Sequence, residues 1–198
     1  MDIPTMKNRL AIIGAGGFAR EVSCWASQSY LCDYYVEDEH AGGNALPLSK
    51  FNPLTQLAVI AIGDPNQRRR IAEAMPKETK WATLIHPSVH ILDPSTVTIM
   101  QGSIICAGTI ITTNVVIGEH SQLNLLTTIG HDCRLGDYFT TAPAANISGN
   151  VTTGKNVYIG ANASVRQKVN IVGNTTIGMG AIVLNDIKDA GTYKGLVK

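Results

Sequence analysis

A six-residue register runs without a slip through the second half of the chain. From Ile99 to Val183, fifteen positions spaced by six hold thirteen aliphatic residues and two threonines, Thr141 and Thr153. The position after each is often glycine, and the fourth position after each is usually small or β-branched. An α-helix repeats its apolar positions about every 3.6 residues and cannot use this pattern. The register predicts a parallel β-helix, in which three hexads form a triangular coil of about eighteen residues around a continuous aliphatic core.

The first eighty-five residues follow another pattern, in which apolar runs alternate with helix-like segments. We expect helices from Ala15 to about Ser27 and from Asn66 to Met75, and strands at residues 9–13, 33–36, 57–62 and 81–85. Alternation of this kind predicts a small parallel α/β sheet. The sequence therefore predicts an α/β domain over residues 1–85 and a β-helix domain over residues 86–198.

The composition argues against some classes of binding partner. The net charge is +1 and charged residues are 16% of the chain, so there is no electrostatic case for binding nucleic acid or a membrane surface. No apolar run is long enough to cross a bilayer, and no secretory signal is recognisable. The four cysteines have no C-x-x-C spacing. We expect a cytoplasmic protein with reduced thiols.

A glycine-rich turn follows the first predicted strand. Gly14-x-Gly16-x-x-Ala19 lies where that strand meets the first helix, and the acidic residues Glu37 and Asp38 follow about twenty residues on. Glycines let the backbone approach an anion, and a helix N-terminus offers free N–H groups. Three interpretations stay open: a nucleotide-sugar diphosphate, which needs only half of a dinucleotide fold; NAD(P); or a purely structural turn.

The chain has five histidines, the residue type most often used as a catalytic base or a metal ligand. They are His40, His86, His90, His120 and His131, and no set among them has the spacing of a three-histidine zinc site on a β-helix, so we expect no metal. We expect His90 and His120 to lie on exposed turns.

His131 differs from the other four because it falls at the turn of its hexad. An imidazole in such a place can act as a base near neutral pH, and Asp132 beside it can orient the ring. One coil onward is Gly149, which would leave room for a ligand and a free backbone N–H, and Asn124 lies seven residues earlier. From the residues alone, two interpretations of His131 remain open: a catalytic base and a surface histidine.

Together these motifs resemble one family along nearly the whole chain. The sequence is similar to the left-handed β-helix (hexapeptide-repeat) acetyltransferases with an N-terminal half-Rossmann domain, which comprise sialic acid O-acetyltransferases and nucleotide-amino-sugar N-acetyltransferases. The resemblance rests on Ile13–Gly17, Tyr35–Asp38, Ala61–Gly63 with the basic segment 67–70, Leu84–Ser88, the pattern Asn-x6-His-[Glu/Asp] at Asn124, His131 and Asp132, and Ser148–Val151.

The resemblance implies roles for particular residues. His131 would be the base, Asp132 its support, and Asn124 the group that positions the sugar. The nucleotide end would be lined by Gly16, Gly17, Phe18, Glu37, Asp38 and Gly63, and the acetyl-CoA arm by Thr140, Gly149 and Ala161. Thr140 stands where many relatives have a second histidine, and the tail from Tyr193 to Lys198 lacks the usual proline.

The resulting hypothesis is an acetyl-CoA-dependent N-acetyltransferase, acting without a metal on the amine of a nucleotide-linked deoxy-amino sugar for surface polysaccharide biosynthesis. The family resemblance also implies a homotrimer. The alternatives are O-acetylation of a free sugar such as a sialic acid, a non-catalytic trimeric β-helix scaffold, and an NAD(P) oxidoreductase.

Overall fold

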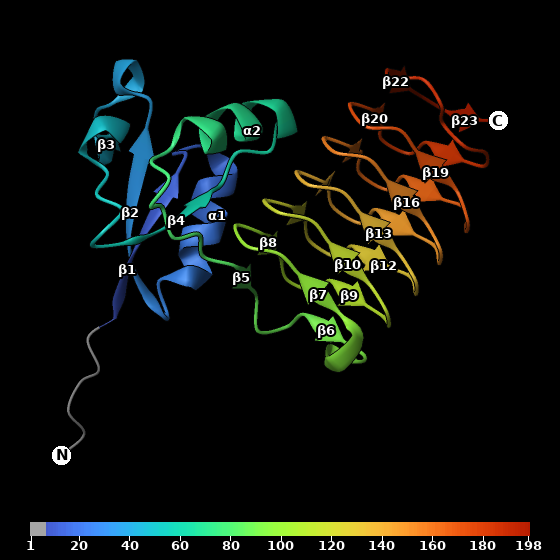
Figure 1. The fold of residues 1–198 in the computed structure, drawn as a ribbon, viewed down its shortest axis with the longest axis horizontal. Helices are drawn as coiled ribbons and strands as arrows, with labels where there is room; N and C mark the ends of the chain where they lie inside the picture. The colour runs from blue at the N-terminus through green and yellow to red at the C-terminus, as the bar shows by residue number, and fades with distance from the viewer. Residues whose placement is uncertain (1–6) are drawn as a thin grey trace.

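A four-stranded parallel sheet forms the N-terminal part of the protein (Figure 1). The structure is a computed structural model and describes residues 7–198. The strand order is β3-β2-β1-β4, with β1 (Asn8–Ile13), β2 (Tyr30–Val36), β3 (Ala45–Pro47) and β4 (Leu57–Ile60). The helices are α1 (Gly17–Ala26) and α2 (Pro65–Ala74), and two short 3-10 helices flank β3 (Asp38–His40 and Leu48–Lys50).

Strand β1 is apolar from Leu10 to Ile13, and these four residues are buried on both faces of the sheet. Leu10 and Ile12 pack with α1 in one core cluster, whereas Ala11 and Ile13 pack with Ile71 of α2 in another. A parallel strand that is covered by helices on both faces has a continuous apolar run in its sequence. This run made β1 predictable.

The C-terminal part is a three-sided prism of two-residue strands that stack in parallel from coil to coil (Figure 1). We number its three sheets in the order in which the chain meets them. The first prism sheet holds β5 (Leu84–Ile85), β8 (Ile104–Ile105), β11 (Gln122–Leu123), β14 (Thr140–Thr141), β17 (Tyr158–Ile159), β20 (Thr176–Ile177) and β22 (Thr192–Tyr193). The second holds β6 (His90–Ile91), β9 (Ile110–Ile111), β12 (Thr128–Ile129), β15 (Asn146–Ile147), β18 (Ser164–Val165), β21 (Ile182–Val183) and β23 (Leu196–Val197). The third holds β7 (Thr98–Ile99), β10 (Val116–Ile117), β13 (Arg134–Leu135), β16 (Thr152–Thr153) and β19 (Asn170–Ile171), and a 3-10 helix (Pro94–Thr96) precedes it.

The predicted register is confirmed in the prism core. The six repeat residues expected to point inward are each 3% exposed or less: Ile117, Leu135, Ile147, Ile159, Ile171 and Ile177. The two threonines in the register also point inward with their hydroxyls bonded, because Thr141 Oγ1 lies 2.7 Å from Thr127 Oγ1 and Thr153 Oγ1 accepts from the Gly136 amide at 3.1 Å. Polar side chains are tolerated in this core where a partner is present.

The turns show a second six-residue period that the sequence analysis did not anticipate. Every sixth residue from Gly102 to Gly180 has a positive φ, between 53° and 74°. Besides glycine and asparagine, these positions include His120, Leu126 and Asp132. A left-handed backbone conformation is costly for a residue with a Cβ, so the stacking of the coils must compensate for it repeatedly.

The predicted final strand over residues 81–85 is divided between the two parts of the protein. Trp81 forms an isolated bridge to Ala58, next to the N-terminal sheet, but Leu84 and Ile85 pair with β8 and begin the prism. Strand β3 was not predicted, because its three residues are too few to show a strand period. No helix among residues 7–198 is long and apolar enough to span a membrane.

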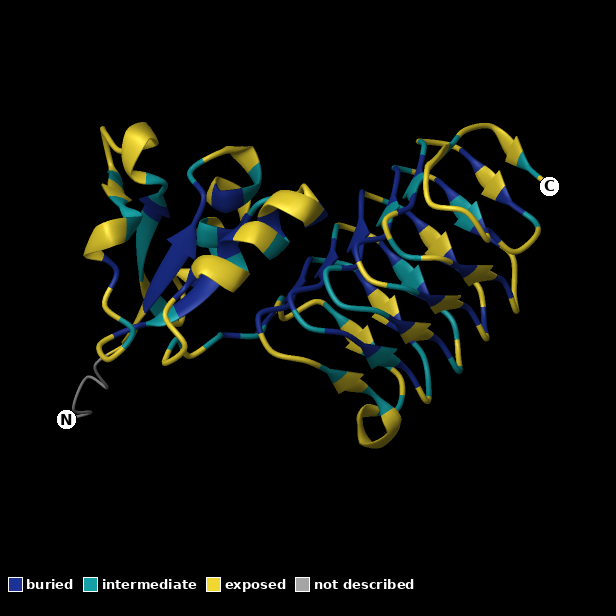
Figure 2. Cartoon of the chain, turned by 45° about the horizontal axis from the view of Figure 1, so that its top comes forward, coloured by how far each residue is buried: buried dark blue, intermediate teal, exposed yellow. Residues whose placement is uncertain are grey.

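A shared core joins the two parts along the first prism sheet. Leu84, Ile104 and Cys106 belong to the same buried cluster as Leu10 and Val22. The side chains that face outward at the start of this sheet are therefore covered by the N-terminal domain, and the buried residues run continuously across the junction (Figure 2). The α/β domain is thus fixed against the first prism sheet.

We expect Ile147→Asp to destabilise the protein by several kcal/mol, because it buries an unpaired carboxylate in the prism core. Asn146→Asp is the matched control, since Asn146 lies on the same strand and is exposed. Chemical denaturation of both variants measures the difference. A loss for Ile147→Asp no larger than that of the control would show that the repeat residues do not carry the core.

Candidate active site

The glycine loop forms one wall of a hollow at the carboxyl ends of β1, β2 and β4. The hollow has a volume of about 370 Å³. Its lining includes five of the six residues predicted for the nucleotide end: Gly16, Gly17, Phe18, Glu37 and Gly63. Gly16 caps the N-terminus of α1 and has open space where a side chain would begin. Because an open sheet of this kind binds ligands at the carboxyl ends of its strands, we call this hollow the nucleotide pocket.

The two acidic residues after β2 are placed differently. Glu37 lines the nucleotide pocket and accepts two hydrogen bonds of 2.8 Å from Arg70, which hold the pKa of its carboxyl below the usual range. Asp38 does not line this pocket. The side chain of Ser49 and then its amide, which donates to Asp38 at 3.0 Å, lower the pKa of this carboxyl, and Asp38 faces a neighbouring hollow. The structure therefore brings Glu37, rather than Asp38, to the predicted nucleotide end.

A second hollow continues from the nucleotide pocket onto the prism. It has a volume of about 210 Å³ and shares Phe18 and Gly63 with the nucleotide pocket. Its other lining residues come from α1 and from the first prism sheet and its turns, and they include Glu21, Gln122, Asn124, Thr140 and Tyr158. We call this the acceptor hollow. A ligand held by the glycine loop can extend through it as far as Asn124.

Thr140 has its hydroxyl engaged inside the chain. Its Oγ1 accepts from Arg68 Nη2 at 2.5 Å and lies 3.2 Å from the Tyr138 carbonyl, to which it donates. The side chain is buried on the first prism sheet, beside the acceptor hollow. The structure thus places Thr140 at the junction with the N-terminal domain, and its predicted contact with the acetyl donor stays a prediction.

His131 lies on the turn between the second and third prism sheets with its side chain 57% exposed. Its Nδ1 is 2.7 Å from Asp132 Oδ2, so the carboxylate keeps the proton on Nδ1 and leaves Nε2 as the basic nitrogen. Asp132 has a φ of 62°, and this left-handed conformation accompanies the contact between its carboxylate and the preceding ring. The predicted pairing of the two side chains is confirmed.

Two further residues that bind around Asp132 were not identified in the sequence analysis. Asn114 Nδ2 donates to Asp132 Oδ1, and Arg134 donates to both the side-chain and the backbone oxygen of Asn114. The hydrogen bonds from His131 and Asn114, in that order, lower the pKa of Asp132. Asn114 lies one coil of eighteen residues before Asp132, so the coil period could have identified it.

Gly149 lies where it was predicted, one coil above His131, but the space there is used differently. A Cβ on Gly149 would come within 2.6 Å of Cε1 and Nε2 of His131. The ring therefore leans over the glycine and fills the room that the sequence analysis had left to a ligand. Within the described residues the Gly149 amide has no hydrogen-bond acceptor, so this N–H remains available beside Nε2.

One chain divides the predicted residues between two edges of the prism. Asn124 and Ala161 lie on turns between the first and second prism sheets, which we call the first edge. His131 and Gly149 lie on turns between the second and third sheets, the second edge. The width of the second prism sheet therefore separates the proposed base from the acceptor hollow of the same chain.

His120 was expected on an exposed turn, and that expectation is wrong. The residue is 3% exposed because the N-terminal domain covers its turn, and its ring packs against Trp81 at 4.5 Å and Tyr138 at 5.4 Å. Burial lowers its pKa to about 4, so the ring is neutral at neutral pH. Within residues 7–198, no three side chains of His, Cys, Asp or Glu come together as a metal site would require.

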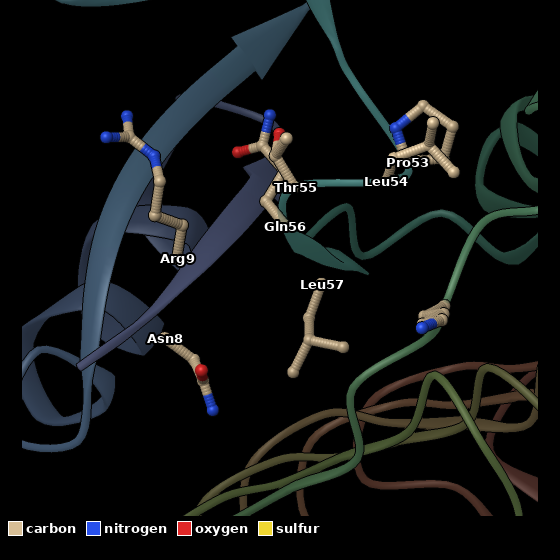
Figure 3. A pocket seen from close by; sticks show the side chains of 8 residues that line it. Asn8, Arg9, Pro53, Leu54, Thr55, Gln56 and Leu57 are labelled. Atoms are coloured by element: carbon tan, nitrogen blue, oxygen red, sulfur yellow. The ribbon is translucent and has the colours of Figure 1, made fainter. Parts of the chain in front are cut away.

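Cys133 is the thiol next to the His131–Asp132 pair. It is buried, donates to the Ser148 carbonyl, and has a pKa raised by burial, so it is not a nucleophile. A hollow of about 200 Å³ lies near the start of β1, lined by Arg9, Gln56 and Lys80 among others (Figure 3). It shares no lining residue with the nucleotide pocket or the acceptor hollow.

Comparison with known proteins agrees with this arrangement. Residues 9–75 match the family model of the PglD N-terminal domain. The chain is 31% identical over 178 residues to a GDP-perosamine N-acetyltransferase of Escherichia coli O157:H7, which covers 82% of this chain and 80% of that protein.

Two solved structures have the same fold over almost the whole chain. The acetyltransferase domain of PglB from Neisseria gonorrhoeae FA1090 superposes with a TM-score of 0.85 at 29% identity, covering 96% of this chain and 97% of that one. PerB from Caulobacter crescentus, solved in complex with CoA and GDP-perosamine, gives a TM-score of 0.85 at 26% identity, with 95% and 94% covered.

An α/β nucleotide pocket that opens onto a left-handed β-helix with a turn histidine defines a class of acyl-transferring enzymes. The chain belongs to the hexapeptide-repeat sugar acetyltransferase family, and the relatives that it matches include an N-acetyltransferase of a nucleotide-linked amino sugar and acetyltransferases solved with CoA or acetyl coenzyme A.

Removing the amide donor to Asp132 tests the network around His131. We expect Asn114→Ala to raise the pKa of the Asp132 carboxyl toward its ordinary value, so that the carboxyl takes up its proton at a higher pH than in the wild type. Carbon-13 NMR titration of the carboxyl measures this shift. Asn150→Ala is the matched control, because Asn150 has the same left-handed backbone and no bond to Asp132. Equal titration of Asp132 in both variants would contradict the assigned network.

Proposed function

We propose that this chain acetylates the amine of a nucleotide-linked deoxy-amino sugar with its diphosphate at Gly16 and Gly17. The observation that carries the proposal is the continuity of the nucleotide pocket with the acceptor hollow through Phe18 and Gly63. A diphosphate suits the amides at the start of α1, and the sugar then extends toward Asn124. Because the E. coli relative is a GDP-perosamine N-acetyltransferase, GDP-perosamine is the first acceptor to test.

The chemistry assigns His131 as the general base. As the amine nitrogen attacks the thioester carbonyl, Nε2 of His131 takes the amine proton, while Asp132 holds the proton on Nδ1. The carbonyl oxygen becomes an oxyanion, and we assign the Gly149 amide, which has no acceptor among residues 7–198, as its hydrogen-bond donor. Such a donor typically contributes about 3 kcal/mol to transition-state stabilisation. Collapse of the tetrahedral intermediate expels the CoA thiolate and leaves an N-acetyl sugar.

A charged groove on the second edge suits the phosphate end of CoA. Arg166 and Lys168 lie two coils beyond Gly130 and Asp132, about 10 Å along the prism at the usual spacing of parallel strands. With Lys188 and Asp186 they line a polar hollow of about 410 Å³. Acetyl-CoA lying along this edge would place its thioester near Gly149 and its phosphates among these cations. Arg166, Lys168 and Lys188 would then contact the CoA phosphates. Binding of this end of CoA would not need the proline that the C-terminal tail lacks.

We propose a homotrimer in which neighbouring chains complete each site. The separation of Asn124 and His131 on two edges supports this, because the first edge of one chain can meet the second edge of the next around a threefold axis. The third contributor to the acyl-donor site, Ala161, lies on the first edge and would then face the CoA bound to the neighbour. We further propose that the enzyme acts in the cytoplasm, in surface polysaccharide biosynthesis.

The alternatives lose support for physical reasons. O-acetylation of a free sugar would leave the nucleotide pocket without a ligand, and a scaffold would have no use for an ordered His131–Asp132–Asn114 network. An NAD(P) oxidoreductase would need a second half of the dinucleotide fold to hold the nicotinamide. The N-terminal sheet has only four strands among the described residues, and the side of the sheet with the nucleotide pocket opens onto the prism.

Gly16→Val tests the nucleotide pocket. No atom lies within 4 Å of the added Cβ and φ is −75°, so the variant should fold normally. The side chain blocks the approach of a diphosphate to the backbone, and we expect the acceptor KM to rise roughly tenfold or more, about 1.4 kcal/mol, with the acetyl-CoA KM unchanged. Steady-state kinetics measure both, with Gly191→Val as the remote control. A matching rise in both KM values, or NADH binding abolished by this change, would reject the proposal.

Mixing two inactive variants tests whether the site is shared. His131→Asn should lower kcat by about 100- to 10,000-fold while leaving CoA binding intact. Co-expressed with Gly16→Val, it should form mixed trimers in which some sites combine an intact pocket with an intact His131 of the neighbour, restoring about a quarter of wild-type activity. Activity is assayed at low acceptor concentration, where each variant alone is nearly inactive. No recovery in mixtures whose subunit exchange is verified would place each site within one chain.

A further inference from the structure

Arg68 of α2 is the largest fully buried side chain among residues 7–198. All five N–H groups of its guanidinium have acceptors. Nε donates to the His120 carbonyl at 2.7 Å, Nη1 to the carbonyls of Ile62 at 2.7 Å and Gly63 at 3.4 Å, and Nη2 to the Tyr138 carbonyl at 2.9 Å and to Thr140 Oγ1 at 2.5 Å. A guanidinium can use all of its donors at once only where the acceptors surround it in one plane.

None of these acceptors is a carboxylate, and no ion pair of Arg68 occurs among residues 7–198. Burial lowers its pKa to about 9, so the group stays charged at neutral pH. A buried cation with no carboxylate at ion-pair distance is a costly way to stabilise a domain junction, since apolar residues of similar volume often serve as well or better. Stability alone therefore does not account for Arg68, whereas the fixed arrangement of its five acceptors does.

The five acceptors belong to two groups that have to be aligned during the reaction. The carbonyls of Ile62 and Gly63 follow β4, and both residues line the nucleotide pocket. The other three acceptors belong to the prism, where Thr140 lines the acceptor hollow. A second tie runs in parallel, because Gln122 of the first prism sheet donates to the Ile60 carbonyl at the end of β4 at 2.8 Å.

We infer that Arg68 is a positioning residue, which fixes the β4–α2 wall of the nucleotide pocket to the floor of the acceptor hollow and so sets where the sugar amine is delivered. The inference rests on the proposed function, because it concerns the acceptor of that reaction. Arg68 itself touches neither substrate in this arrangement. It acts through Gly63 on the nucleotide side and through Thr140 on the prism side.

Rigid alignment of this kind affects the rate more than the binding of either substrate. The nucleotide is held by the glycine loop and α1, which Arg68 does not contact through its guanidinium. The sugar amine, in contrast, lies beyond Gly63, where a shift of the pocket relative to the prism changes its distance to the thioester. A misplacement of about 1 Å can lower a rate on the order of 100-fold.

The decisive variant is Arg68→Lys, which keeps the charge and loses the planar fork. We expect kcat to fall on the order of 100-fold, with the acetyl-CoA KM and the Kd for GDP, used as a probe of the pocket, unchanged. Arg69→Lys is the matched control on the same helix, because Arg69 is partly exposed and reaches only Glu73 at 3.9 Å. Unchanged kcat in Arg68→Lys, or a loss of GDP binding that accounts for the whole effect, would overturn the inference.

A second variant covers the case in which Arg68→Lys does not fold. Thr140→Val removes one acceptor of the five and keeps the side-chain volume, so it should fold and lower kcat in the same direction by a smaller factor. A Thr140→Val enzyme with wild-type kcat would overturn the inference.

Hydrogen exchange gives a readout that does not depend on activity. In the wild type we expect GDP to slow amide exchange at residues 14–17 and also, through Arg68, at residues 138–142 of the prism. In Arg68→Lys the first effect should persist and the second should disappear, whereas a purely structural role would leave the pattern of protection by GDP intact. A wild-type protein that couples the two segments but acetylates no nucleotide-linked amino sugar would reject the proposed function and retain the role of Arg68.

Discussion

Coil-on-coil stacking is the constraint on which the rest of this structure depends. Each turn residue lies one coil above the residue eighteen positions earlier, and backbone hydrogen bonds such as Asn150 N to His131 O, at 2.7 Å, hold the coils in register. This stacking places the ring of His131 over Gly149 and the amide of Asn114 against Asp132. It also maintains the left-handed conformation that recurs every six residues, which an isolated turn containing Leu126 or Lys168 would not sustain.

The α/β domain depends on that prism for its orientation. Its apolar contacts with Leu84, Ile104 and Cys106 are not directional, so they bury area without fixing an angle. The polar ties through Arg68 and Gln122 supply the direction. Because Arg68 binds the carbonyl of Gly63, and Gly63 lines both hollows, the contacts that orient the domain also hold the wall at which the two hollows meet.

The six-residue register and the strand–helix alternation made both domains predictable, because each is a local pattern that packing reinforces. The pairing of His131 with Asp132 was predictable for the same reason, and Gly149 could be placed by adding one coil. Asn114 could have been identified in the same way, by going back one coil from Asp132, but it was not predicted. The burial of His120 and the assignment of Leu84 to the prism were not predictable, because they depend on how the two domains meet. The position of Asp38 was not predictable either, because it is set by the contact with Ser49 inside the α/β domain. The sequence analysis wrongly predicted free space above His131. The six-residue register places Gly149 there, but the side-chain rotamer of His131 decides whether its ring covers the glycine.

The division of the site between two edges follows from the triangular cross-section. A prism of this width cannot bring a turn between its first and second sheets next to a turn between its second and third sheets. The second sheet that separates them carries the exposed apolar residues Ile110, Ile182 and Leu196, which another surface could cover. In a closed ring of three chains, each second edge with its base and CoA groove would face the acceptor hollow of a neighbour. The acceptor would then enter from the α/β side and acetyl-CoA along the prism axis, so that the two substrates meet without competing for the same opening.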